Sequence, residues 1–186
     1  MGTSSPPTGQ SSLRAAPRRA KGLICTVEVR RSARRTRTVS ARLEDRRLIV
    51  SIPARMSRAE EAEWVDRMAR RFEERARRGR LNANGELERR AQQLNRRFFG
   101  GELTWEELRY VTNQGRRYGS CSVASRTIRL SDRLAEMPSW VLDYVIVHEL
   151  AHLVVPDHSA AFWRLVNRYP LAERARGYLI AKGMET

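Results

Sequence analysis

The feature that most constrains the fold is the run WVLDYVIVHELAHLVV at residues 140–155. It is apolar almost all the way round a helix, which is typical of a helix that is buried on every side. Yet it carries His148, Glu149 and His152. Each polar group buried there without a partner would cost on the order of a few kcal/mol. The chain must therefore cover this helix and also give its polar groups a partner. We expect the helix to end at Pro156.

The spacing of these polar groups indicates a metal site. His148 and His152 are four residues apart, so they lie on one helix face and can bind the same ion. Glu149 follows His148 directly and can reach a water on that ion. This is the H-E-x-x-H arrangement, in which the glutamate acts as the general base.

A third ligand follows from the next turn of the chain. A catalytic zinc takes three protein ligands and keeps a fourth position for water. His158 is the remaining histidine of the sequence, and Pro156 would reverse the chain in front of it. We therefore expect one zinc per chain, on His148, His152 and His158. Asp157 has two open roles, as a cap of the next helix or as a hydrogen-bond acceptor for His158.

The run RYGSCS at residues 117–122 supports two interpretations. It suits a strand that edges a cleft, where an extended peptide can pair. Alternatively, Gly119 and Ser120 form a turn and Cys121 is a small core residue. Under the first interpretation Tyr118, Gly119, Ser120 and Cys121 border the site. Cys121 could also bind metal, although three histidines already suffice.

Residues 22–56 are predicted to form a small antiparallel sheet. Apolar and polar side chains alternate at residues 23–30 and 36–43, and residues 48–52 look similar, which indicates three strands. Asp45 lies in the turn before the third of them.

Residues 57–101 are predicted to form amphipathic helices. Ser57 and Glu60 are spaced as a capping box, and Trp64, Met68 and Phe72 follow as an apolar stripe. In the second helix the stripe is Leu87, Ala91, Leu94 and Phe98, and Gly100 and Gly101 end it. The chain thus divides into a disordered basic tail, a β region, helices and a catalytic core, at residues 1–21, 22–56, 57–101 and 102–186.

The net charge of +15 belongs to the first half of the chain: residues 1–100 hold 25 of the 36 basic and 11 of the 21 acidic residues. DNA, bound through this basic half, is therefore an open candidate for a partner. Arginine is used almost exclusively, which a GC-rich genome would also produce, and pairs such as Glu63 and Arg67 already neutralise some of it. No run is apolar enough to span a bilayer, no secretory signal is seen, and Cys25 and Cys121 form no C-x-x-C pair. We therefore expect a cytoplasmic protein without membrane contact.

The runs RYGSCS, TIRLSDRL and VLDYVIVHELAHLVVPDHSAAFW together resemble the YgjP-like metallopeptidase family, which is related to SprT-like and WLM metalloproteases. The resemblance covers roughly residues 23–180 and is most specific over 117–163. It implies a zincin-like core, with the zinc histidines on His148, His152 and His158, and Glu149 as the catalytic glutamate. It also implies that the bond cleaved is a peptide bond. The family usually carries tryptophan where this chain has Tyr118.

The sequence thus predicts an α+β protein, with a small antiparallel β part followed by a mainly helical zincin-like core. Its predicted function is that of a zinc metallopeptidase acting on a protein or peptide. Two alternatives stay open. The same site could hydrolyse a nucleotide or other phosphoanhydride, since arginines suit phosphate. The chain could also be a basic nucleic-acid-binding module with a structural zinc, although such a site needs no base like Glu149. No residue is assigned to stabilising the transition state; Tyr169 and Tyr178 are open candidates.

Overall fold

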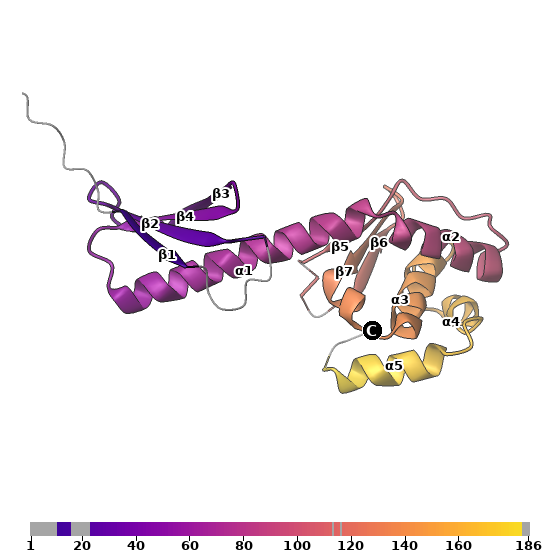
Figure 1. The fold of residues 1–186 in the computed structure, drawn as a ribbon. Coiled ribbons are helices and arrows are strands. Elements are labelled where there is room, and N and C mark those ends of the chain that lie inside the picture. The colour runs from indigo at the N-terminus through magenta and orange to yellow at the C-terminus, as the bar shows by residue number, and fades with distance from the viewer. Residues whose placement is uncertain (1–10, 16–22, 113, 116, 184–186) are drawn as a thin grey trace, which may run out of the picture. The chain divides into compact units, whose positions relative to one another are not determined.

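The computed structural model describes residues 11–15, 23–112, 114–115 and 117–183. Two compact units divide the chain, Met1–Arg77 and Arg78–Thr186. The first contains one small β-sheet and most of one helix, and the second contains one small β-sheet and several helices, so the predicted α+β class is confirmed (Figure 1). None of the helices in these described ranges is both long and apolar enough to cross a membrane.

The sheet of the first unit is mixed, and the prediction of an antiparallel sheet was wrong. Its strands are β1 (Ser11–Ala15), β2 (Thr26–Ser32), β3 (Ser40–Glu44) and β4 (Arg47–Pro53), in the order β1-β2-β4-β3. Asp45 and Arg46 adopt φ angles of 46° and 64°, which makes a tight β3–β4 hairpin. This hairpin presents β4 to β2, and the two strands run parallel. The alternation of apolar and polar side chains indicates a strand, but it does not indicate which strand of a hairpin pairs with a third strand, or in which direction.

Part of the tail that we predicted to be disordered forms a strand in the structure. Ser11–Ala15 form β1, which pairs with β2 in antiparallel register. The free edge of β2 offers unpaired backbone groups, and a strand can pair there whatever its side chains are. The rest of that tail, residues 1–10 and 16–21, lies outside the described residues.

Helix α1 (Arg58–Ala83) begins at the predicted capping box. The Ser57 amide donates to Glu60 Oε2 at 2.9 Å, and the Glu60 amide donates to Ser57 Oγ at 3.2 Å. The predicted stripe of Trp64, Met68 and Phe72 packs on the apolar face of the sheet. The two local predictions for this helix, its start and its buried face, are confirmed.

The second unit surrounds one apolar helix. Its sheet has the order β5-β7-β6, from β5 (Glu107–Val111), β6 (Gly119–Ser122) and β7 (Thr127–Ser131). The helices are α2 (Glu86–Phe99), the short 3-10 helix η1 (Asp132–Glu136), α3 (Ser139–His152), α4 (Ala160–Val166) and α5 (Ala172–Ala181). Gly100 and Gly101 end α2 with φ angles of 72° and 80°, as predicted.

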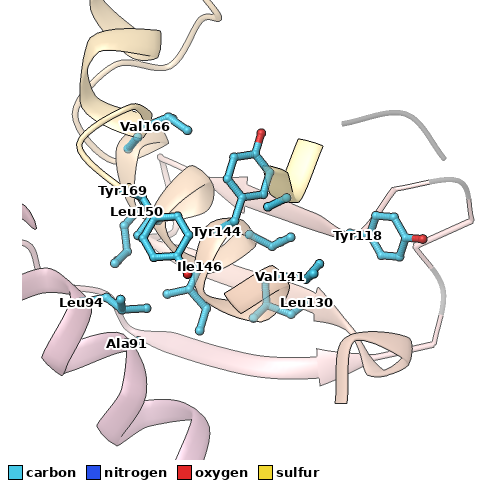
Figure 2. Close-up of a cluster of buried hydrophobic side chains, with 14 of the residues drawn as sticks. Ala91, Leu94, Tyr118, Leu130, Val141, Tyr144, Ile146, Leu150, Val166 and Tyr169 are labelled. Atoms are coloured by element: carbon cyan, nitrogen blue, oxygen red, sulfur yellow. The ribbon is translucent and has the colours of Figure 1, made fainter. Parts of the chain in front are cut away.

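Helix α3 lies at the centre of this unit. Its apolar side chains pack against residues of β7, α2 and α4 (Figure 2); the cluster includes Val141, Ile146 and Leu150 of α3 with Leu130, Leu94 and Val166. Arg90 of α2 donates to both carboxylate oxygens of Asp143, which ties α3 to α2. The helix ends at His152, earlier than the Pro156 boundary we expected, because the amides of Leu153 and Val154 donate to carbonyls three residues back, those of Leu150 and Ala151, in a tighter turn.

Candidate metal centre

Three histidines converge beside the end of α3. His148, His152 and His158 each offer a ring nitrogen, and these atoms all lie within 4.8 Å of one another. His148 Nε2 and His158 Nε2 are 3.2 Å apart. A tetrahedral zinc with nitrogens at 2.0–2.1 Å would hold them about 3.3 Å apart. The donor type and the spacing therefore fit a zinc ion.

Helix α4 holds the three imidazole rings in place. His148 and His152 are one turn apart on α3, and His158 lies in the turn before α4. Phe162 is fully buried, and its ring centroid is 4.8, 4.4 and 4.7 Å from the rings of His148, His152 and His158. Trp163 stacks on His158 at 5.7 Å. The aromatic side chains of α4 thus fix the orientation of all three imidazoles.

The charge state of the histidines suits metal binding. Burial, followed by the neighbouring His152 and His158, lowers the pKa of His148 to about 3. His152 Nδ1 lies 3.3 Å from the carbonyl oxygen of Val155, which accepts its hydrogen when that nitrogen is protonated. The Nε2 atom of His152 then keeps its lone pair. Neutral imidazole is the form that binds a metal.

Glu149 lies next to these histidines and is almost entirely buried, with 4% of its surface exposed. Burial raises the pKa of its carboxyl to about 8, while the charge of Arg117 acts in the opposite direction. Gly119 of β6 faces it: a Cβ added there would lie 2.2 Å from Glu149 Oε1. The glycine is thus required by the space that the carboxylate occupies. Sequence reasoning did not find this contact, which joins residues 30 positions apart in the chain.

A cavity of about 410 Å³ opens at this place. It is lined by the three histidines, by Glu149 and by residues 117–121. Its remaining lining is mainly apolar: Val123, Tyr144, Val145, Pro156 and Leu179. The three candidate ligands and the candidate base therefore share one space that a substrate can enter.

Residues 118–121, the expected border of the site, all line the cavity. Tyr118 is buried, with the Arg133 guanidinium 5.4 Å from its ring centre, and Ser120 Oγ accepts a hydrogen bond from Gln114. Burial raises the pKa of Cys121 to about 11. Cys121 is not among the residues whose ligand atoms converge with those of the three histidines. β6 is a strand at the sheet edge, in line with the first of the two interpretations above.

The hydrogen bonding of Asp157 favours the capping role over the contact with His158. Its Oδ1 accepts a hydrogen bond from the Ser159 amide at 3.2 Å, just before α4. Its pKa is lowered mainly by Ser159, and His158 contributes least. The geometry thus favours an Asx-type cap over a hydrogen bond to the ligand histidine.

Sequence reasoning missed two residues with polar side chains, Tyr144 and Arg117, that line the cavity. Tyr144 lies four positions before His148, so helical periodicity could have identified it; burial raises its pKa to about 12, and its buried hydroxyl has no hydrogen-bond partner among the described residues. Arg117, two positions before Gly119, is the other. The earlier tyrosine candidates lie elsewhere. Tyr169 donates to the Trp140 carbonyl at 3.0 Å, and Tyr178 packs on the Trp140 ring.

A family model identifies the family of this chain. Residues 80–180, more than half of the chain, match the YgjP-like metallopeptidase domain. The metallopeptidase zymogen abylysin of Pyrococcus abyssi is 22% identical, with a TM-score of 0.46 over 52% of this chain and 93% of that one. The metallopeptidase zymogen jannalysin of Methanocaldococcus jannaschii is 18% identical, with a TM-score of 0.45 over 53% of this chain and 98% of that one. No curated protein matches the chain.

Proposed function

Since this chain belongs to the YgjP-like metallopeptidase family, we propose that it hydrolyses peptide bonds with one zinc ion held by His148, His152 and His158, and with Glu149 as the general base. The observation that carries the proposal is the convergence of three histidine nitrogens within 4.8 Å of one another at a cavity that Glu149 also lines. A structural zinc would have a closed fourth position and would need no carboxylate beside it.

The metal is proposed to be zinc because of its donors. All three are imidazoles, in contrast to the oxygen donors that magnesium and calcium prefer. A site with three protein ligands that faces a cavity leaves the fourth position to water or substrate. When bound, zinc supplies a Lewis acid that polarises the attacked carbonyl and lowers the pKa of water.

The chain's own residues supply the proton transfers. Glu149 accepts a proton from the attacking water and then delivers it to the leaving amine. Burial raises the pKa of Glu149, and a carboxylate with a raised pKa is a stronger base. The backbone at Gly119 comes close enough to keep the Glu149 side chain directed at the cavity.

The shape of the site suits an extended peptide. β6 pairs with β7 on one side and is the last strand of its sheet, so its other edge can pair with a substrate backbone. Gly119 and Cys121 of β6 line the same cavity as the histidines. A peptide added to this edge would therefore run past Glu149. On this basis Tyr118, Gly119, Ser120 and Cys121 border the substrate cleft.

Nucleotide hydrolysis fits the cavity less well. A triphosphate carries several negative charges, and sites for it gather several cationic donors or backbone amides. Among the described residues that line this cavity, Arg117 supplies the one basic side chain apart from the histidines. The mainly apolar remainder of the lining favours a peptide over a phosphoanhydride.

DNA binding through the basic half of the chain, residues 1–100, stays a prediction, and exposed arginines on two adjacent segments support it. Arg55 donates to the Thr36 carbonyl at 3.0 Å, which joins residues 33–39 to residues 54–58. Arg34 and Arg37 lie in the first of these segments, and Arg58, at the end of the second, is the first residue of α1; all three are exposed. Affinity for a DNA duplex that falls steeply with salt would support it, since counterions are released on binding. A cytoplasmic location also stays a prediction, supported by the free thiols of Cys25 and Cys121.

One preparation can test peptide against nucleotide hydrolysis. Zinc-loaded protein is incubated with casein, with a panel of peptides and with nucleoside triphosphates, and the Glu149→Gln variant is run beside it. We expect cleavage of peptide bonds that the variant loses. Zinc-dependent phosphate release with no proteolysis would replace the proposed function by the nucleotide alternative.

A further inference from the structure

Arg117 lies at the mouth of the candidate active site and has no role in the chemistry described so far. It lines the cavity together with Gly119 and Cys121, the residues two and four positions further along the chain. Gly119, at the start of β6, faces Glu149, so Arg117 lies just before the point at which the chain meets the reacting groups.

The backbone that carries Arg117 is held firmly. Arg133 donates to the carbonyls of Gly115 and Arg117 at 2.8 and 3.3 Å. The Arg117 amide donates to the Gln114 carbonyl at 2.8 Å, and the Ser131 amide donates to the Tyr118 carbonyl at 2.7 Å. These hydrogen bonds fix the backbone from which the Arg117 side chain projects, so the backbone loses little entropy when a ligand binds.

The positive charge of Arg117 is not neutralised by an ion pair among the described residues. Its side chain is exposed, and it forms no ion pair with any described residue. Glu149 is the single acidic residue among the described residues that line the cavity. Glu149 feels the charge of Arg117 but is deeply buried, whereas Arg117 stays at the solvent-exposed rim. The mouth of the cavity thus presents one unpaired guanidinium.

We propose that Arg117 selects substrates by binding a carboxylate close to the scissile bond. This inference rests on the proposed peptidase function. A guanidinium can form two parallel hydrogen bonds to a carboxylate. Two residues of chain span at most about 7 Å, so the Arg117 backbone lies within that distance of Gly119, which faces Glu149. At that distance it meets a residue that flanks the cleaved bond. The carboxylate belongs either to an acidic side chain or to the C-terminus of the substrate.

Binding can be measured without turnover in zinc-loaded Glu149→Gln protein. The probes are heptapeptides that differ only in carrying Glu, Gln or Lys at one position, which is moved along the peptide. Each peptide is made with a free and with an amidated C-terminus. We expect the Glu peptide to bind about tenfold more tightly than the Gln peptide at one position, the size expected for a hydrogen bond to a charged group. A preference for the free terminus alone would identify the C-terminal carboxylate as the ligand.

Arg117→Gln should abolish this preference and leave the affinity for the Gln peptide unchanged, and Arg117→Lys should keep part of it. Arg129→Gln is the matched control, because Arg129 is exposed on the neighbouring strand β7 and does not line the cavity. Equal affinity for Glu and Gln peptides at every position and either terminus would overturn the proposal. A loss of affinity in Arg117→Gln that is equal for the Glu, Gln and Lys peptides would also overturn it.

The same peptides separate this proposal from the proposed function. If wild-type protein cleaves none of them while the Glu149→Gln protein still prefers the acidic one, peptide hydrolysis is wrong and the carboxylate site stands. If wild type cleaves Glu and Gln peptides at the same kcat/KM, hydrolysis stands and the role of Arg117 is wrong.

Discussion

Gly119 lies so close to Glu149 that a methyl group at position 119 would occupy the place of the carboxylate, with Cβ 2.2 Å from Oε1 and 2.8 Å from Cδ. The contact joins the edge strand of the second sheet to the helix that carries the histidines. It makes the position of the candidate base depend on a residue that has no side chain.

Gly119→Ala is therefore expected to displace the Glu149 side chain while the histidines stay in place. A misplacement of about 1 Å can cost on the order of a hundredfold in rate, so kcat should fall by that order. Zinc content should be unchanged. Gly177→Ala is the control, since an added Cβ at that helical position meets nothing within 4 Å. Wild-type kcat in Gly119→Ala would show that the contact does not position the base.

Metal analysis tests the three histidines. Purified protein should hold about one zinc per chain, as expected for a site with three histidine ligands. His152→Ala should lose most of it, because two imidazoles remain and the hydrogen bond to Val155 is gone. Elemental analysis of both proteins after dialysis against the same zinc buffer measures this. A wild type that binds no transition metal would contradict the proposed function.

Glu149→Gln separates the roles of base and ligand. The amide has nearly the shape of the carboxylate, so zinc content should stay at the wild-type level. Activity should fall by roughly two to four orders of magnitude, the usual contribution of a general base. Zinc content and peptide cleavage are measured on the same sample. If zinc is lost while activity per bound zinc is unchanged, Glu149 is a ligand.

The capping box at the start of α1 gives a prediction about stability. Ser57→Ala removes the acceptor of the Glu60 amide and should lower the free energy of unfolding by about 1 kcal/mol, whereas Ser57→Thr should lower it much less. Hydrogen bonds from Ser57 lower the pKa of Glu60 from 4.5, so this contribution is present above pH 4.5 and lost as pH falls through the lowered value. Urea titrations at pH 7 and pH 3 should therefore show a larger deficit at pH 7.

The sequence alone was sufficient wherever structure depends on neighbours in the chain. The capping box, the stripe of α1 and the glycine stop of α2 follow from periods and end signals of a few residues. The same locality singled out His148, Glu149 and His152, since a spacing of four residues determines a helix face.

Only the tertiary structure could decide contacts between distant segments. The mixed sheet depends on which hairpin edge meets β2, and the pairing of β1 depends on a free edge. The approach of Gly119 to Glu149, and the place of Arg117 at the rim of the cavity, depend on how β6 packs against α3. Side-chain patterns indicate which residues are buried but not which distant residues they meet, because many arrangements bury the same apolar surface.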